Sequence, residues 1–324
     1  MNADGSIAVE QLTREFGELI AVDKVDLTVP SGGIFGFLGP NGAGKTTLVK
    51  ILTTILAPTS GRATVAGYDV VSQGHEVRSA IGVALQEVGL DSLMTARELL
   101  VLQAKLFGAD SDTAKQTAER LLKTVGLDDV DPKKRTGQYS GGMKRRLDLA
   151  LALVHDPKIL FLDEPTTGLD PASRAGIWEE VRRLNRQGVT IFLTTQYLEE
   201  ADRLADEVAI INHGRIVAQG APLKLKQDLG GEVVALTFDG AETAARADAE
   251  LSDIAPKRQL CGAELSCYFT DASSMVPEIV RRLDTASIPV GGLSLSRPTL
   301  DDVFLRATGE RLQQATGSEG ASAR

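Results

Sequence analysis

Residues 39–47 read Gly39-Pro40-Asn41-Gly42-Ala43-Gly44-Lys45-Thr46-Thr47 and match the pattern G-x-x-x-x-G-K-[ST]. The apolar residues before them, up to Leu38, indicate a buried strand, and a helix is expected from Lys45 to Leu56. In such a strand-to-helix turn, glycines let backbone N–H groups surround phosphate oxygens, the helix dipole favours negative charge, and Lys45 adds a positive charge. The sequence therefore predicts a phosphate-binding loop, with Thr46 as a ligand of Mg²⁺.

The overall composition limits the class of protein. The chain has 324 residues, 43% of them hydrophobic, and a net charge of −9, which suits one large domain or two modest ones. The acidic balance and an aromatic content of only 4% argue against nucleic acid as a partner. Met1 to Glu10 lack the features of a signal peptide, and the apolar runs are too short to span a bilayer. We therefore expect a folded, cytoplasmic chain that does not cross a membrane by itself.

The first half of the chain changes character near Thr95. Short β-rich runs at Ile7 to Val9 and Val25 to Val29 indicate a β-rich opening. From Thr95 to Asp156 the apolar residues recur with helical spacing instead, so we expect a helical subdomain there. The residues that carry this period are Leu99, Leu102, Leu106, Ala118, Leu121, Leu122 and Val125.

A parallel sheet is expected after the helical subdomain. Continuous hydrophobic runs of strand length occur at Ile159 to Leu162, Val189 to Thr194 and Val208 to Ile211. Helical segments at Ala172 to Arg186 and Tyr197 to Ala205 separate them. This order is typical of repeated β-α-β units whose sheet is covered on both faces, so the predicted fold is α/β.

A second, smaller domain is predicted after Gly230. The order strand, helix, β-hairpin, helix, strand in the following residues indicates a βαββαβ unit of the α+β type. We expect residues 1–230 to form the first domain and residues 231–310 the accessory domain. Residues 311–324 are expected to be a flexible tail, because they are rich in small and polar residues and show no period.

Two carboxylates follow the strand that closes at Leu162. Asp163 and Glu164 stand at the carboxyl end of that strand, where the phosphate-binding loop of a doubly wound sheet also lies. We expect Asp163 to hold Mg²⁺ through water, and Glu164, on the opposite side of the strand, to accept a proton from an attacking water. The alternative is that Glu164 has no catalytic role and only caps the next loop.

The stretch Tyr139-Ser140-Gly141-Gly142-Met143 narrows the class further. Ser140 is a good N-cap and the two glycines leave the following helix N-terminus bare, so hydroxyl, amides and dipole can meet a phosphate together. Placed between the glycine loop and the two carboxylates, this stretch resembles the signature motif of ATP-binding cassette (ABC) ATPases. The basic residues that follow, Lys144-Arg145-Arg146, are interpreted as a solvated helix face rather than as a nucleic-acid patch.

The resemblance to ABC ATPases covers roughly Ile7 to Gly220 and assigns further residues. It identifies Gln86 with the Q-loop glutamine that reaches Mg²⁺ and leads into the surface for a membrane subunit, and Asp170 with the D-loop. The residues it implies for nucleotide binding are Phe16, Gly39, Pro40, Asn41, Gly42, Ala43, Gly44, Lys45, Thr46, Thr47, Gln86, Ser140, Gly141, Gly142 and Asp170; those for Mg²⁺ are Thr46, Gln86 and Asp163; those for catalysis are Glu164, Gln196 and Lys45.

One assignment has an alternative, and two residues depart from the pattern of the family. Phe16 corresponds to the aromatic residue that stacks on adenine, with an ordinary core phenylalanine as the alternative. Met143 replaces the usual signature glutamine. Gln196 stands where most ABC ATPases carry a switch histidine; its amide can donate a hydrogen bond to the γ-phosphate, but it cannot titrate.

Three longer stretches are similar to one branch of the family, the daunorubicin/doxorubicin-resistance-type exporter ATPases. They are residues 139–148, 194–202 and 298–305. The resemblance implies a P-loop NTPase fold with a β-rich N-terminal part, a helical subdomain and a small C-terminal α+β domain. It also implies a subunit that hydrolyses ATP, with Mg²⁺, to export drugs or lipophilic compounds through a separate membrane permease.

The same resemblance implies an assembly. Because each chain carries each half of the site once, two copies are expected to form a homodimer that sandwiches two ATP molecules. The permease is expected to hold this dimer peripherally at the cytoplasmic face of the cell membrane. Two alternatives stay open: a non-transport ABC ATPase that acts on ribosomes or DNA, and a regulatory module that does not hydrolyse ATP.

Overall fold

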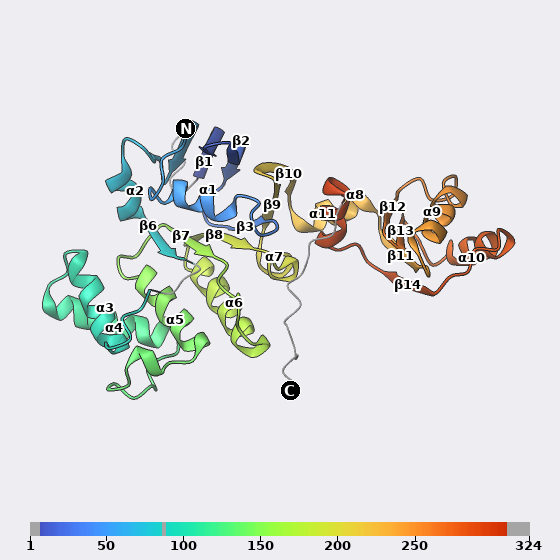
Figure 1. The fold of residues 1–324 in the computed structure, drawn as a ribbon. Helices are drawn as coiled ribbons and strands as arrows, with labels where there is room; N and C mark the ends of the chain where they lie inside the picture. Colours follow the sequence, from blue (N-terminus) through green and yellow to red (C-terminus); the bar gives the residue numbers. More distant parts are fainter. Residues whose placement is uncertain (1–6, 86–88, 310–324) are drawn as a thin grey trace, which may run out of the picture. The chain divides into compact units, whose positions relative to one another are not determined.

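Figure 1 draws the chain as a computed structural model. The structure describes residues 7–85 and 89–309. The predicted Q-loop residue Gln86 and the tail predicted at residues 311–324 therefore lie outside the described residues.

The chain divides into two compact units. One consists of Met1–Gln196 with Arg203–Ile216, and the other of Tyr197–Asp202 with Val217–Arg324. Each unit has a sheet and a hydrophobic core of its own. The division between the units falls within strand β10, before the boundary predicted near Gly230.

An antiparallel sheet opens the first unit. Its strands lie in the order β2 (Leu19–Val29), β1 (Ile7–Phe16), β4 (Ser60–Val65) and β5 (Tyr68–Asp69). β1 and β2 are longer than the two short runs predicted from the sequence, because shifts of register between Val9 and Glu15 let the pair continue past polar residues. The prediction of a β-rich opening is confirmed.

A six-stranded sheet forms the centre of the first unit. Its strands lie in the order β10 (Arg215–Gly220), β9 (Glu207–Asn212), β3 (Ile34–Leu38), β8 (Thr190–Thr195), β7 (Ile159–Asp163) and β6 (Ile81–Ala84). β3 pairs in parallel with β8 and β9, and β7 pairs in parallel with β6 and β8. Every residue of β3, β7 and β8 is buried, which explains their continuous hydrophobicity. The predicted α/β fold is confirmed.

Both faces of this sheet are covered by hydrophobic core. On one face Leu160 and Leu162 of β7 join a core that contains the helical subdomain and α6 (Pro171–Arg186). On the other face Ile159 and Phe161 join a core that contains α1 (Lys45–Leu52) and the antiparallel sheet. A further short helix of this unit is α2 (Gly74–Ala80), whereas α7 (Leu198–Leu204) belongs to the second unit up to Asp202.

Helix α1 ends earlier than the predicted Leu56. The hydroxyl of Thr53 donates to the carbonyl oxygen of Val49 at 2.8 Å, and Thr54 adopts a left-handed backbone with φ of 64°. A left-handed residue after the last turn is a common helix terminator. The apolar residues beyond Leu52 therefore lie in a turn rather than in the helix.

The helical subdomain consists of α3 (Ala96–Leu106), α4 (Ser111–Thr124), a short 3₁₀ turn (Thr136–Gln138) and α5 (Gly141–Ala152). The residues that carried the predicted period in α4 are buried, whereas of the three in α3 only Leu99 packs against the core. Ala96, Leu100 and Ala104 are the buried residues of α3, whereas Leu102 and Leu106 are exposed. The small alanines of the true buried stripe gave a weaker signal than the leucines beside it.

The second unit contains the predicted βαββαβ order. Its elements are α8 (Pro222–Leu229), β11 (Glu232–Thr237), α9 (Ala241–Glu250), β12 (Arg258–Cys261), β13 (Glu264–Phe269), α10 (Val276–Thr285), β14 (Gly292–Ser296) and α11 (Leu300–Thr308). The sheet order is β12-β13-β11-β14, all antiparallel. Alternate strand residues such as Val234, Leu236 and Cys267 pack with α9 and α10 on one face.

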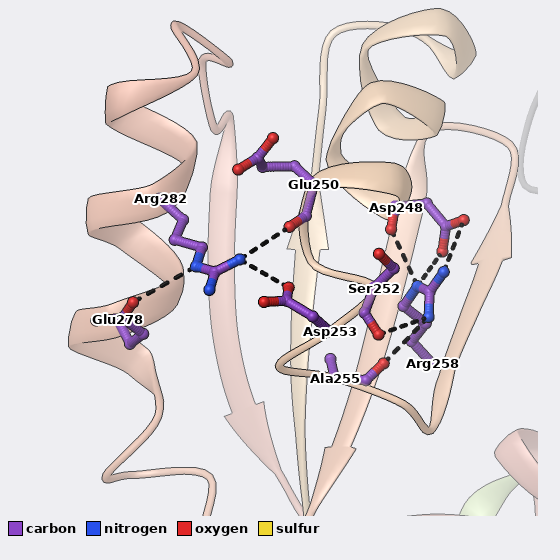
Figure 2. Close-up of polar contacts among 8 residues, drawn as sticks. All are labelled: Asp248, Glu250, Ser252, Asp253, Ala255, Arg258, Glu278 and Arg282. Atoms are coloured by element: carbon purple, nitrogen blue, oxygen red, sulfur yellow. Dashed lines mark hydrogen bonds and ion pairs between the residues drawn. The ribbon is translucent and has the colours of Figure 1, made fainter.

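Figure 2 shows two arginines that join elements of the second unit. Arg258 of β12 donates through Nε to Oδ1 of Asp248 in α9 at 2.7 Å, and it also donates to main-chain carbonyls of the α9–β12 connection. Arg282 of α10 donates through Nη1 to Oδ1 of Asp253 in the same connection at 2.7 Å. The two guanidinium groups therefore hold this connection from both sides.

Candidate active site

The loop from Gly39 to Gly44 joins β3 to α1 and adopts a conformation that requires glycine. Gly44 has φ of 107°, and a Cβ on it would lie 2.2 Å from the carbonyl oxygen of Ala21. Gly42 also has a positive φ, of 81°. The N-cap residue of α1, Gly44, makes no side-chain cap hydrogen bond, which leaves the first-turn amides without a capping side chain among the described residues. This backbone suits an anion such as a phosphate.

Lys45 is the first residue of α1, and only 4% of its surface is exposed. Its Nζ donates to the carbonyl oxygens of Gly39 at 2.8 Å and Pro40 at 3.1 Å, and it forms an ion pair with Oε1 of Glu164 at 3.3 Å. Burial lowers the pKa of Lys45, and the charge of Glu164 opposes that shift. The ammonium group is thus fixed at the loop by three acceptors.

A cavity of about 410 Å³ lies beside Lys45. At its edge the ring of Phe16 is 45% exposed, with the guanidinium carbon of Arg14 4.5 Å from the ring centroid. Phe16 is therefore not a core phenylalanine. The stacking of its ring on adenine stays a prediction. The cavity is lined by Phe16, Leu19, Ala21, Asn41, Gly42, Gly44, Lys45, Thr46, Thr47 and Glu164.

Asp163, the last residue of β7, is 1% exposed. Oγ1 of Thr194 donates to its Oδ1, whereas its Oδ2 is buried and has no hydrogen-bond partner among the described residues. A buried carboxylate oxygen requires a donor or a cation. Carboxylate and hydroxyl oxygens, supplemented by phosphate and water, are the ligands that Mg²⁺ prefers. Asp163 and Thr46 therefore fit a Mg²⁺ ion.

That ion would depend on ligands from outside the protein. Within residues 7–85 and 89–309 no group of three or more His, Cys, Asp or Glu side chains is placed to hold a metal ion. A Mg²⁺ held by one or two protein oxygens and the phosphates of a nucleotide needs no such group.

Glu164 does not continue strand β7. Its φ is 48°, in the left-handed region, which costs a non-glycine residue on the order of 1–2 kcal/mol. Its N–H donates to the carbonyl oxygen and to Oγ1 of Thr194, both at 3.1 Å, and Oγ1 of Thr167 donates to its Oε2 at 3.2 Å. The expectation that Glu164 faces the opposite side of the strand is wrong. The strand ends at Asp163, and the turn brings the Glu164 carboxylate to Lys45.

Several predicted residues are not among those that line the cavity: Gly39, Pro40, Ala43, Ser140, Gly141, Gly142, Asp163, Asp170 and Gln196. Ser140 caps α5 by accepting from the N–H of Met143 at 3.3 Å. Asp170 caps α6, and a hydrogen bond from the Ser173 hydroxyl is the main cause that lowers the pKa of its carboxyl. Gln196 follows β8 and is half-buried. Their roles toward the nucleotide stay predictions.

Arg145 is the residue near this site that the sequence interpretation missed. It is 6% exposed, so the interpretation of Lys144-Arg145-Arg146 as a solvated face is wrong at its middle position. Its guanidinium donates to main-chain carbonyl oxygens at the ends of β6 and β7. Leu149, one helical turn further along α5, is also buried, and this spacing was the available signal.

A glycine loop between a strand and a helix, a buried lysine and a carboxylate pair at the end of a parallel strand define a P-loop nucleoside triphosphatase. The serine-glycine-glycine start of α5 gives the narrower class, an ABC ATPase. Comparison with known proteins agrees: a family model described as "ABC transporter" matches residues 22–167.

Two relatives extend this match over nearly the whole chain. The chain is 42% identical over 319 residues to daunorubicin resistance ATP-binding protein DrrA2 of Streptomyces coeruleorubidus, covering 98% of this chain and 99% of that protein. It is 39% identical over 309 residues to Nod factor export ATP-binding protein I of Burkholderia lata, covering 95% and 98%. The chain belongs to the family of ABC transporter ATP-binding proteins.

The fold comparison gives the same class. A solved structure described as an ATP binding subunit of an ABC transporter superposes with a TM-score of 0.62 at 25% identity, over 68% of this chain and 92% of that chain. The predicted P-loop ABC ATPase fold is confirmed.

Proposed function

We propose that the chain is the ATP-binding and ATP-hydrolysing subunit of an exporter that expels drugs or other lipophilic compounds through a separate membrane permease. The observation that carries this proposal is the buried pair of Lys45 and Glu164, 3.3 Å apart, beside a cavity of about 410 Å³. This pair places a cation for phosphate next to a carboxylate for a water molecule. The names of the relatives, daunorubicin resistance and Nod factor export, support export as the process that is powered.

The cavity has suitable side chains for ATP with Mg²⁺. The exposed ring of Phe16 would stack on adenine, and the amides of the loop 39–47 would hold the phosphates. Thr46 and Asp163 would hold Mg²⁺, with Gln86 as the further ligand that the family resemblance implies. When bound, Mg²⁺ neutralises charge on the phosphate oxygens.

Hydrolysis would use three side chains of the site. Glu164 would accept the proton of the attacking water, and Thr167 would orient its carboxylate through the 3.2 Å hydrogen bond to Oε2. Lys45 would stabilise negative charge on the phosphates. Gln196 would donate its amide hydrogen to the γ-phosphate.

A second copy of the chain would complete each site. Ser140, Gly141 and Gly142 begin α5, and Asp170 begins α6, yet none of them lines the cavity beside Lys45. A helix N-terminus of this kind suits the phosphate of a nucleotide held by another copy. Two copies related by a twofold axis would give two equivalent sites and enclose two ATP molecules.

The surface of α3 supports contact with a membrane permease. Leu102, Leu106 and Phe107 are large apolar residues that are exposed there, and Leu93 is exposed just before the helix. Contiguous exposed apolar residues are typical of surfaces that bind another protein. In the described part of the chain, no helix is both long enough and apolar enough to span a membrane. We therefore place the ATPase dimer peripherally at the cytoplasmic face, held by the permease.

Two points of the proposal concern the rest of the chain. The named relatives give no support to an ATPase that acts on ribosomes or DNA, so that alternative is not proposed. We propose residues 231–310 as an accessory domain for assembly or regulation, because the predicted nucleotide residues all precede it.

The proposal is tested by daunorubicin accumulation in cells that express the chain with a permease encoded in an adjacent reading frame. Wild-type chain should lower accumulation, and Glu164→Gln should leave it at the level of cells without the chain. Equal efflux by Glu164→Gln and wild type would contradict ATP hydrolysis as the driving reaction.

The permease surface has a variant of its own. Leu106→Glu should keep the ATPase activity of the purified chain but lose efflux, because a charge then stands where an apolar contact is needed. The matched control is Leu223→Glu, at an exposed leucine of α8, which should keep both activities. Normal efflux by Leu106→Glu would place the permease elsewhere.

A further inference from the structure

The guanidinium of Arg145 is buried, with 7% of the side chain exposed. A buried cation is stable only when its donors meet acceptors. Three of its acceptors are main-chain carbonyl oxygens, those of Leu85 at 2.6 Å, Asp163 at 3.0 Å and Pro165 at 2.9 Å. A further acceptor is Oδ2 of Asp148 at 3.1 Å. Arg145 therefore joins the ends of β6 and β7 to helix α5.

Two of these carbonyl groups stand on either side of Glu164 in the sequence. Glu164 itself has φ of 48°, a conformation that persists in an L-residue only when its surroundings impose it. Thr194 holds the Glu164 N–H from β8, and Arg145 holds the two flanking carbonyl groups from α5. The planar fork of the guanidinium fixes the angle between those carbonyls as well as their distance.

We propose that Arg145 is a positioning residue that holds the main chain of Glu164 so that its carboxylate faces the cavity. This inference rests on the proposed role of Glu164 as the proton acceptor. Arg145 is not among the residues that line the cavity, and it bonds the carbonyl groups on either side of Glu164, so we infer that it acts through Glu164. It also links the reactive turn to α5, the helix that begins at Ser140.

Two neighbouring arginines give a matched test of the proposal. Lysine keeps the charge of Arg145 but has a single nitrogen, which cannot bond several carbonyl groups in fixed directions. Arg146 lies on the same helix, with its guanidinium beside Gly126 and Gly176 rather than at β7. Arg145→Lys should lower kcat for ATP hydrolysis by about 10–100-fold with the ATP Kd within about twofold, as for other supporting residues of reactive groups. Arg146→Lys should leave both quantities within about twofold of wild type.

A double variant shows whether Arg145 acts through Glu164. In the Glu164→Gln background, Arg145→Lys should change the residual single-turnover rate by less than about twofold, because the group it positions is gone. The same 10–100-fold loss in both backgrounds would show that Arg145 acts independently and would overturn the inference. A wild-type kcat in Arg145→Lys alone would also overturn it. A wild-type kcat in Glu164→Gln would instead overturn the proposed function.

Folding is controlled by the urea midpoint of each variant. If Arg145→Lys does not fold, Asp148→Asn replaces it, because this change keeps the guanidinium and removes only the carboxylate that orients it. A folded Asp148→Asn chain should have a lower kcat with an unchanged ATP Kd. In the Glu164→Gln background, Asp148→Asn should have no further effect on the rate. An unchanged kcat in that variant would overturn the inference.

Discussion

The end of β7 in the first unit and the α9–β12 connection in the second are both held by arginines, with opposite consequences for the carboxyl groups beside them. Arg145 is 7% exposed and its partner Asp148 is half-buried, and desolvation raises the pKa of Asp148 to about 6. Arg282 is 30% exposed, and its hydrogen bond holds the pKa of Asp253 below the usual value (Figure 2). In both pairs the arginine favours the charged carboxylate, but at Asp148 the desolvation is the larger effect and sets the direction of the pKa shift.

The two regions also differ in what their arginines hold. Near Glu164 the acceptors are main-chain carbonyls around a left-handed residue, and an oxygen of Asp163 close by has no partner among the residues that the structure describes. Around Arg258 the acceptors are a carboxylate and the carbonyls of a connection. The turn at Glu164 therefore combines a left-handed residue with an unpaired carboxylate oxygen among the described residues, a combination that suits a functional site.

The largest expected difference between the two regions is in ATP binding. Lys45→Ala should raise the ATP Kd by at least about 100-fold, because removing one partner of a buried charge contact costs on the order of 2–5 kcal/mol. Titration with a fluorescent ATP analogue measures this. Arg258→Met is the control from the second unit and should bind ATP like wild type. A Lys45→Ala Kd close to the wild-type value would contradict the phosphate site.

The next largest effect is on the pH dependence of stability. The pKa of Asp148 is about 6 in the folded chain against an ordinary value of 3.8, so the folded state holds this proton more tightly. The free energy of unfolding contributed by Asp148 therefore falls as pH rises from about 4 to above 6, by up to about 3 kcal/mol. Urea unfolding at several pH values should show that the free energy of unfolding of Asp148→Asn rises relative to that of wild type over this range. Parallel pH profiles would contradict a raised pKa at Asp148.

An effect on catalysis of similar size is expected at Gln196. One hydrogen bond to a charged phosphate is worth on the order of 1.5–3 kcal/mol, or about tenfold to a hundredfold in rate when it forms fully in the transition state. Gln196→Ala should therefore slow steady-state ATP hydrolysis by that factor, and Gln196→His should retain activity. A wild-type rate with unchanged ATP dependence in Gln196→Ala would make the residue a spacer.

The smallest effect is expected from the arginine of the second unit. Arg258→Met should lower the free energy of unfolding by about 1–2 kcal/mol, since it removes a hydrogen bond to a partly exposed carboxylate. The kcat for ATP hydrolysis should not change. A parallel fall in kcat would show that the two regions are not separate in function.

The parts of the fold that the sequence predicted are those with local patterns. The loop 39–47 needs glycine wherever the backbone turns around an anion, and β7 is hydrophobic because both of its faces are buried. The buried face of α3 was not predictable in the same way, because two helical stripes overlap there. One contains Leu99, Leu102 and Leu106, and the other contains Leu100. Only packing against α4 and α5 selects the stripe with Ala96 and Ala104.

The backbone conformation of Glu164 could not be predicted from local sequence patterns either. Glu164 precedes Pro165, and a residue before proline normally favours an extended backbone, so nothing nearby indicates a φ of 48°. That conformation is imposed by partners distant in sequence, Thr194 and Arg145. The sequence placed the two carboxylates at the end of β7, and their roles stay predictions. The main-chain contacts that orient Glu164 could not be predicted from it.

The most direct test of the central claim is steady-state ATP hydrolysis by purified Glu164→Gln beside wild type, with gel filtration in ATP. If Glu164 accepts the proton of the attacking water, kcat should fall by about 10²–10⁴-fold. The ATP Kd should stay within about twofold of wild type, because Lys45 and the loop 39–44 are intact, and the variant should elute as an ATP-stabilised dimer. A wild-type kcat in Glu164→Gln would contradict the account.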